Sequence, residues 1–373
     1  MSGAPNRPQK RRTHDHSTPT PATGTCRNRS TLQCRHRRHD RVRRGVEQHR
    51  RHDRRHRMPV VLEGTSITVY SGRSEKLVQP LFDGFTALTG VTVDVRYGDS
   101  GELAALLLTE GDASPADVYF GQDAGALGAI EEAGLFATLP DPLLSRVEPA
   151  FRSATGGWVG TSGRARVIIY NADLVPTPPA SLDDLLDAQW KGKIGFAPTN
   201  ASWQSFVTAL RVLRGEDGAE TWLTGFAAND PIAFEKNGVV RDAVNSGEVA
   251  LGLINHYYLY EKIKAEGPDA VVAKNHYLRD GDAGSLVNVA GAGILATSTN
   301  AAGAQALVDY LLSETAQSYI SSSVFEYPLA AGVTAYADLP TLKELKAPAI
   351  NLADLKSLEA TQELLVRVGL LTK

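Results

Sequence analysis

From Ser66 onward, the chain alternates short runs of β-branched and aromatic residues with amphipathic stretches at helical spacing. The predicted strand Ile67-Thr68-Val69-Tyr70 is followed by a predicted helix over 75–88 and a second strand over 91–95. In this helix, the apolar residues recur at steps of three and four and predict a buried stripe of Leu77, Leu81, Phe85 and Leu88. Alternation of this kind predicts an α/β fold.

The same pattern continues and then restarts after a proline-rich connector at 175–179. Further strands are predicted at 116–120, 167–170, 193–196, 231–234 and 249–254, and further helices at 101–110, 123–133, 181–188, 201–213, 217–228, 238–246 and 256–265. Near Asn288 the sequence again resembles a crossing strand. We therefore predict two α/β lobes, 65–160 plus 288–338 and 164–287 plus 339–373, with a hinged cleft between them for a ligand.

Residues 1–57 have a different composition from the rest of the chain. They contain 17 Lys or Arg, 4 Asp or Glu and seven of the nine histidines, whereas residues 58–373 have a net charge of −16. Because this segment has no apolar periodicity, we predict that residues 1–60 are disordered. An arm that binds nucleic acid or a metal is one interpretation. The preferred one is a non-native stretch, read upstream or out of frame where an export signal is expected.

Several classes of function are poorly supported by the sequence. Cys26 and Cys34 both lie in the basic segment, so residues 58–373 contain no thiol, and no apolar run is long enough to predict a transmembrane helix. The sequence lacks a phosphate loop, a dinucleotide fingerprint, a nucleophile elbow and a zinc signature. Outside the basic segment, only His256 and His276 supply imidazole. We therefore predict that the protein is not an enzyme.

Two adjacent tyrosines, Tyr257 and Tyr258, stand where a hydrophobic strand ends and a helix begins. A phenol has a pKa of about 10, but a trivalent cation favours the deprotonated oxygen. Hard Fe(III) prefers such oxygen ligands, and two phenolates would reduce its charge from +3 to +1. The alternative is that both rings only pack at the interface between the lobes.

With these tyrosines in place, the sequence resembles the ferric-iron-binding solute-binding proteins of bacterial ABC importers, over about residues 65–373. The resemblance includes Tyr70-Ser71-Gly72-Arg73, Ser114-Pro115-Ala116-Asp117-Val118-Tyr119, Ser162-Gly163-Arg164-Ala165-Arg166-Val167 with Tyr170-Asn171, Trp190-Lys191-Gly192-Lys193 and, most specifically, Asn255-His256-Tyr257-Tyr258. It implies a two-lobed periplasmic-binding-protein fold of type II, with Tyr257 and Tyr258 as ligands of Fe(III).

The resemblance also implies a synergistic anion, carbonate or phosphate, held near Asn255 and Asn237. Asn200 and Ser202 open a predicted helix whose free N–H groups favour an anion. Gln122 lies where relatives have a glutamate and is included among the anion-binding candidates. Arg164 and Arg166 alternate with Ala165 on one strand and share a face, so each could bind an anion or pair with an acidic side chain.

The remaining protein ligand of the metal stays open at this stage. Some relatives have a histidine where Ser74 stands, and some have a third tyrosine near Ala201, where the nearest aromatic residue here is Trp203. The candidates are Asp123, Glu75 and Glu102. As an alternative, Asp123 caps its helix, and Glu75 and Glu102 stabilise helix N-termini through the dipole.

The leading hypothesis is a monomeric extracytoplasmic receptor, periplasmic or lipid-anchored, that captures Fe(III) with an anion and delivers it to an ABC permease. No nucleic-acid partner is expected under this hypothesis. A second hypothesis keeps the fold and replaces iron with an organic or phosphonate-type anion held by Arg164, Arg166 and the helix start near Asn200. A third is nucleic-acid binding through the basic segment.

Overall fold

The computed structural model describes residues 64–372. All of them belong to one compact unit, Val60–Lys373. The predicted disordered or non-native segment 1–60 lies outside the described residues. None of the helices in 64–372 combines the length and apolar character that crossing a membrane requires.

A mixed sheet forms the centre of this unit. Its strands are β1 (Ser66–Ser71), β2 (Thr92–Tyr97), β3 (Val118–Gly121), β4 (Val159–Asn171), β5 (Ile194–Phe196), β6 (Ile232–Ala233), β7 (Leu251–Asn255), β8 (Ala273–His276), β9 (Val287–Ile294) and β10 (Tyr327–Pro328). Their order is β2-β1-β3-β9-β4-β7-β5-β6, and β8 and β10 also pair with β4. Strand β1 is parallel to β2 and β3, as the alternation of strands and helices predicts.

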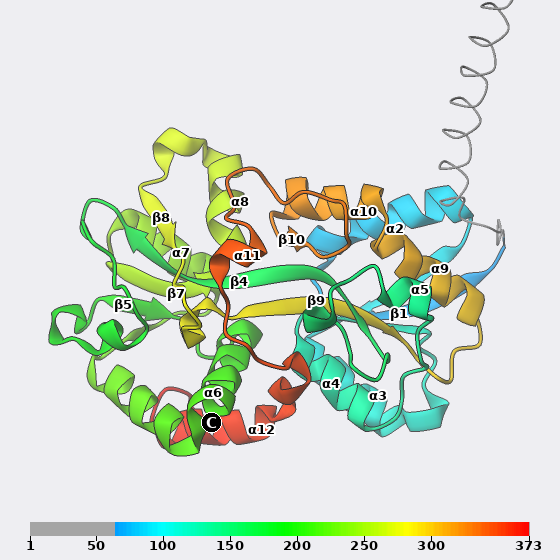
Figure 1. Ribbon diagram of the computed structural model, residues 1–373, viewed down its shortest axis with the longest axis horizontal. Helices are drawn as coiled ribbons and strands as arrows, with labels where there is room; N and C mark the ends of the chain where they lie inside the picture. Colours follow the sequence, from blue (N-terminus) through cyan, green and yellow to red (C-terminus); the bar gives the residue numbers. More distant parts are fainter. Residues whose placement is uncertain (1–63, 373) are drawn as a thin grey trace, which may run out of the picture. The chain divides into compact units, whose positions relative to one another are not determined.

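Strand β4 links the two halves of the sheet. Its first half, Val159 to Ala165, is antiparallel to β9, whereas its second half, Arg166 to Tyr170, is antiparallel to β7. Figure 1 shows β4 and β9 running through the middle of the described unit, between β1 at one end and β5 and β7 at the other. Side chains near the middle of β4 therefore lie where both halves of the sheet meet.

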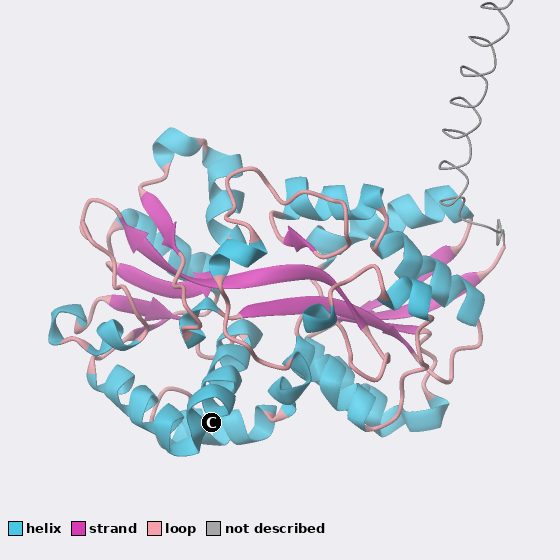
Figure 2. Cartoon of the chain, in the orientation of Figure 1, coloured by secondary structure: helices cyan, strands magenta, loops and turns pink. Residues whose placement is uncertain are grey.

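Helices lie on both sides of the strands (Figure 2). They are α2 (Glu75–Thr89), α3 (Ser100–Glu110), α4 (Ala124–Glu132), α5 (Asp141–Leu144), α6 (Ala201–Ala228), α7 (Asn237–Ser246), α8 (Tyr257–Glu266), α9 (Ala301–Leu311), α10 (Glu314–Tyr319), α11 (Leu342–Leu345) and α12 (Leu358–Arg367), with a π-helix at Ile320–Val324. The helix predicted over 75–88 is α2, which ends at Thr89 and is capped by Gly90 with a φ of 75°.

Separate hydrophobic clusters hold the two ends of the sheet. One contains Val69, Phe85, Val118 and Leu307 around β1, β3 and α9, and another contains Trp203, Phe206, Trp222 and Phe226 of α6. A third packs α7 and β7 together. The clusters are consistent with two lobes, and the predicted division into 65–160 plus 288–338 and 164–287 plus 339–373 stays a prediction.

Three local predictions differ from the structure. Leu88 is 60% exposed, so the buried stripe of α2 ends at Phe85. The helix predicted at 181–188 is replaced by two 3-10 turns, η4 (Asp183–Leu186) and η5 (Ala188–Trp190). There, the Asp184 carboxylate accepts from the backbone N–H groups of Ala180 and Ser181, which favours a tight turn. Strand β4 has 13 residues and begins well before the predicted start at Val167.

Candidate functional site

The two tyrosines lie at the start of α8, directly after β7. Their rings stack with centroids 4.3 Å apart and an interplanar angle of 28°. Tyr257 is 4% exposed and Tyr258 is half-buried. Burial, Tyr258 and the carboxylate of Glu326 raise the pKa of Tyr257 well above its ordinary value, and Arg164 opposes that shift. A nearby cation is therefore needed before this phenol loses its proton at neutral pH.

His256, immediately before the pair, is fully buried and bonded on every side. Its Nδ1 accepts from the Ala165 N–H at 3.1 Å, so its Nε2 carries the proton and donates to the Phe325 carbonyl at 2.8 Å. Its carbonyl accepts from the Asn275 side chain at 2.8 Å. Burial lowers the pKa of His256 to about 4, so its ring is neutral at pH 7.

A buried ion pair lies close to the tyrosines. Arg73, just after β1, donates through Nη2 to Glu326 Oε1 at 2.9 Å, and both side chains are at most 4% exposed. The other Glu326 oxygen accepts from the Ser162 hydroxyl. Burial favours the neutral acid, but Arg73 and Arg164 outweigh it and hold the pKa of Glu326 below its ordinary value. Glu326 therefore stays a carboxylate.

Arg164 is 1% exposed, and none of its three guanidinium nitrogens has a hydrogen-bond partner within residues 64–372. It lies opposite Asn288 in the β4–β9 ladder. The Asn288 amide oxygen accepts from Ala124 N–H at the start of α4, at 3.2 Å, whereas its Nδ2 finds no partner in the described part of the chain. Several buried donors therefore stay unused around Arg164, as expected where an anion binds.

Arg166, two residues further along β4, is equally buried, but two of its three guanidinium nitrogens have partners and only Nε has none within residues 64–372. It donates to Ser202 Oγ at 3.3 Å and to the Leu253 carbonyl at 2.9 Å. Its guanidinium carbon lies 5.6 Å from the Trp203 ring centroid and 5.2 Å from that of Phe206. Burial lowers the pKa of Arg166 to about 9, so it remains charged at neutral pH.

The predicted residues at the start of α6 and α7 join Arg166 in one hydrogen-bonded cluster. Asn200 caps α6 by accepting from the Ser202 N–H at 3.0 Å and from the Ser202 hydroxyl at 2.6 Å. Asn237 is 1% exposed and donates to Asn200 Oδ1 and Ser202 Oγ, both at 3.1 Å. We call Arg166, Asn200, Ser202 and Asn237 the Arg166 cluster, and Arg73, Arg164, Asn288 and Glu326 the Arg164 cluster.

Among the other candidates, Asn255 is buried at the end of β7, opposite Arg166 in the ladder. Gln122 is half-buried, and its backbone N–H donates to Ser100 Oγ at 2.9 Å. Asp123 caps α4 through Ala126 N–H at 3.1 Å, and burial raises its pKa despite Arg164.

The structure does not bring Glu75 or Glu102 into this group, because both are exposed on the first turns of α2 and α3. Within residues 64–372, no group of three or more His, Cys, Asp or Glu could hold a metal ion.

Sequence reasoning did not place Arg73, Glu326, Ser162 or Asn288 in the site. Two signals were available. Arg73 lies in the Tyr70-Ser71-Gly72-Arg73 motif, and Glu326 is an isolated acid between Phe325 and Tyr327. A charged residue in an aromatic run that becomes fully buried needs a partner of opposite charge. The sequence does not indicate which arginine supplies it.

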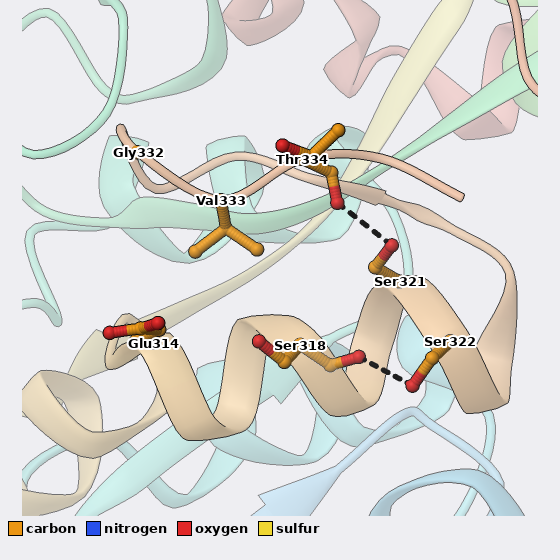
Figure 3. A pocket seen from close by; sticks show the side chains of 7 residues that line it. All are labelled: Glu314, Ser318, Ser321, Ser322, Gly332, Val333 and Thr334. Atoms are coloured by element: carbon orange, nitrogen blue, oxygen red, sulfur yellow. Dashed lines mark hydrogen bonds between the residues drawn. The ribbon is translucent and has the colours of Figure 1, made fainter. Parts of the chain in front are cut away.

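A groove elsewhere on the surface has a volume of about 350 Å³. It lies along α10 and the π-helix, and Figure 3 shows its lining residues: Glu314, Ser318, Ser321, Ser322, Gly332, Val333 and Thr334. The Ser321 hydroxyl donates to the Thr334 carbonyl, and the Ser322 hydroxyl donates to the Ser318 carbonyl. None of these residues belongs to either arginine cluster. Because its lining has neither a phenol nor a buried unpaired charge, we place the candidate site at the tyrosines.

Comparisons with known proteins match this chain to bacterial solute-binding proteins. The family model described as bacterial extracellular solute-binding protein matches residues 113–357. The chain is 35% identical over 308 residues to the Fe(3+)-binding periplasmic protein of Serratia marcescens, covering 82% of this chain and 90% of that one. It also matches iron-bound HitA from Pseudomonas aeruginosa, with a TM-score of 0.78, 36% identity and coverage of 82% and 99%. A Trichodesmium protein in complex with iron and citrate (IdiA, FutA) gives a TM-score of 0.71, 32% identity and coverage of 82% and 100%.

Proposed function

We propose a function for this chain, which belongs to the bacterial extracellular solute-binding proteins. It captures Fe(III) with a small anion through Tyr257 and Tyr258 and delivers it to an ABC permease. The predicted two-lobed fold of type II is confirmed by the solved structures that it matches. Relatives of this class are periplasmic binding proteins rather than enzymes. We infer an extracytoplasmic, monomeric receptor.

The stacked phenols beside an unpaired guanidinium are the main support for this proposal. Two phenolates reduce the charge of bound Fe(III) from +3 to +1. Around them, the three buried arginines Arg73, Arg164 and Arg166 outnumber the two buried carboxyl groups, Glu326 and Asp123. A buried group with an excess of positive charge favours an anion together with the metal. Carbonate or phosphate would meet the free donors of Arg164, whose planar fork suits either.

We infer that ligand binding is coupled to closure of the two lobes. Tyr257 is almost inaccessible in this conformation, so iron must enter when the site is more open. The ferric ion and its anion stabilise the closed form because only there do they contact residues from both halves of the sheet. A ligand with equal affinity for both forms would cause no closure.

The first test is colour. With ferric citrate and carbonate, the purified protein should develop the red or purple band of tyrosinate-to-iron charge transfer. Tyr257→Phe/Tyr258→Phe should lose this band, because phenylalanine supplies no oxygen ligand. The matched control Tyr310→Phe/Tyr319→Phe removes two phenols from α9 and α10 and should keep it. A double variant at 257 and 258 that stays coloured would overturn the assignment of the ligands.

The second candidate function is binding of an organic or phosphonate-type anion without iron. The observation that favours it is Arg164 itself, whose free donors suit an anion whether or not a metal is present. A wild-type protein that stays colourless with iron, carbonate, phosphate and citrate, yet binds a phosphonate by calorimetry, would support this function and exclude iron capture.

A further inference from the structure

His256 connects the candidate iron ligand to parts of the chain that are distant in sequence. Its backbone N–H donates to the Ala165 carbonyl at 3.0 Å, and its Nδ1 accepts from the N–H of the same residue. These two bonds fix the start of α8 to the middle of β4. The residue that immediately follows is Tyr257, so the position of its ring depends on this attachment.

The other ring nitrogen of His256, Nε2, bonds to a strained backbone segment at Phe325. Phe325 has a φ of 60°, in the left-handed region that a bulky residue rarely adopts. Its carbonyl accepts from His256 Nε2 at 2.8 Å, and its ring packs on Tyr336 with centroids 4.9 Å apart. The next residue is Glu326, whose carboxylate binds Arg73. The unusual backbone at Phe325 therefore orients the buried carboxylate.

We infer that His256 is a positioning residue that fixes Tyr257 relative to the Arg73–Glu326 ion pair, so that the metal ligands and the anion-binding arginines form one unit. The inference rests on the proposed function. Because both ring nitrogens contact backbone atoms, His256 acts through geometry and contacts neither the iron nor the anion. Aromatic neighbours hold the ring, with the centroid of Tyr327 at 4.9 Å and that of Tyr257 at 6.0 Å.

The test compares three substitutions at position 256. Glutamine can accept from Ala165 N–H and donate to the Phe325 carbonyl, asparagine is too short to do both, and leucine can do neither. We expect His256→Leu to weaken iron binding at least tenfold in a citrate competition and to shift its charge-transfer band. His256→Asn should lie between the two, and His256→Gln should return to within about threefold of wild type. His276→Leu is the matched control and should leave band and affinity unchanged.

Rescue by glutamine separates positioning from general stability, because glutamine restores the two hydrogen bonds of the imidazole ring. A shift of the charge-transfer band is a second criterion, because the band reports the geometry of the tyrosine ligands directly. If His256→Leu does not fold, the ordering of His256→Gln above His256→Asn decides the question. Equal affinity and an unchanged band in all the folded variants would overturn the inference while leaving the proposed function intact.

A double-mutant cycle tests the link to the ion pair. If His256 and Glu326 act as one unit, His256→Leu combined with Glu326→Gln should lose little more affinity than the worse single variant. Additive losses would overturn the link.

If wild type shows no iron band, the proposed iron function fails, and calorimetry with citrate alone replaces the colour assay. The same ordering of variants would then support the positioning role, whereas equal citrate binding, or none, would overturn it.

Discussion

Arg164 and Arg166 lie two residues apart on β4 and are buried to the same extent, at 1% and 2% exposure, yet their surroundings differ. Arg166 donates to Ser202 and Leu253 and lies over two aromatic rings. Arg164 has no hydrogen-bond partner between residues 64 and 372. The Arg166 cluster is thus held mostly by its own hydrogen bonds, although Arg166 Nε and Asn237 Oδ1 lack partners among residues 64–372, whereas all three guanidinium nitrogens of Arg164 lack one.

This difference also has a cost in free energy. A buried charge without hydrogen bonds destabilises a folded protein by several kcal/mol unless an opposite charge is near. Around Arg164, the fully buried carboxylate of Glu326 supplies that opposite charge. Glu326 therefore offsets part of the cost of burying Arg164, whose nitrogens still lack hydrogen-bond partners within residues 64–372.

The largest effect is expected for Glu326→Gln, which removes the buried carboxylate shared by Arg73, Arg164 and Ser162. Removing one partner of a buried pair leaves uncompensated charge, so the free energy of unfolding should fall by about 3 to 5 kcal/mol. Urea unfolding measures this loss. A fall below about 1 kcal/mol would show that Arg164 does not depend on Glu326.

The same variant has a predicted pH dependence. The pKa of Glu326 is held below its ordinary value of 4.5, so its contribution to stability is fully present above pH 4.5 and is lost as pH falls through the lowered value. Wild type and Glu326→Gln should therefore differ most above pH 4.5, and the difference should shrink in more acidic solution. A difference that stays constant down to pH 2 would contradict the ionised state of Glu326.

A smaller effect of opposite sign is expected for Arg164→Met without ligand. Methionine fills much of the volume without unsatisfied donors, and Glu326 keeps Arg73 as its partner, so the free energy of unfolding should rise by about 2 kcal/mol. The stabilisation that carbonate or phosphate gives to wild type should disappear, because the free donors are gone. Thermal unfolding with and without each anion measures both effects. Destabilisation of the unliganded protein, with the anion response kept, would show that Arg164 is a structural residue.

The sequence predicted the parts of this comparison that depend on local spacing. Arg164 and Arg166 share one face because side chains on a strand alternate, and Tyr257 and Tyr258 follow a strand because of the hydrophobic run before them. The two-lobed fold followed from the alternation of strands and helices and is confirmed. The roles of these residues in binding stay predictions.

Long-range contacts could not be predicted in this way. Arg73 and Glu326 are 253 positions apart, and only the fold brings them together. The early part of β4 was missed because Gly160 and Gly163 interrupt the β-rich pattern. At Gly160, a Cβ atom would come within 2.4 Å of the Phe151 carbonyl oxygen, so close packing requires glycine there. These glycines therefore hid the start of β4, before Arg164, whereas the strand character around the two arginines was predicted.

The smallest effect is expected in the Arg166 cluster, for Asn200→Ala. Asn200 caps α6 and accepts from Ser202 and Asn237, so its removal should lower the free energy of unfolding by about 1 kcal/mol. Asn200→Asp retains the acceptor and is the matched control, with stability close to wild type. Because Ser202 and Asn237 still bond each other, the anion response of the Arg164 cluster should be unchanged. If Asn200→Ala and Asn200→Asp both remove that response, the anion binds at the start of α6, where a carboxylate would repel it, and the two clusters exchange the roles assigned to them.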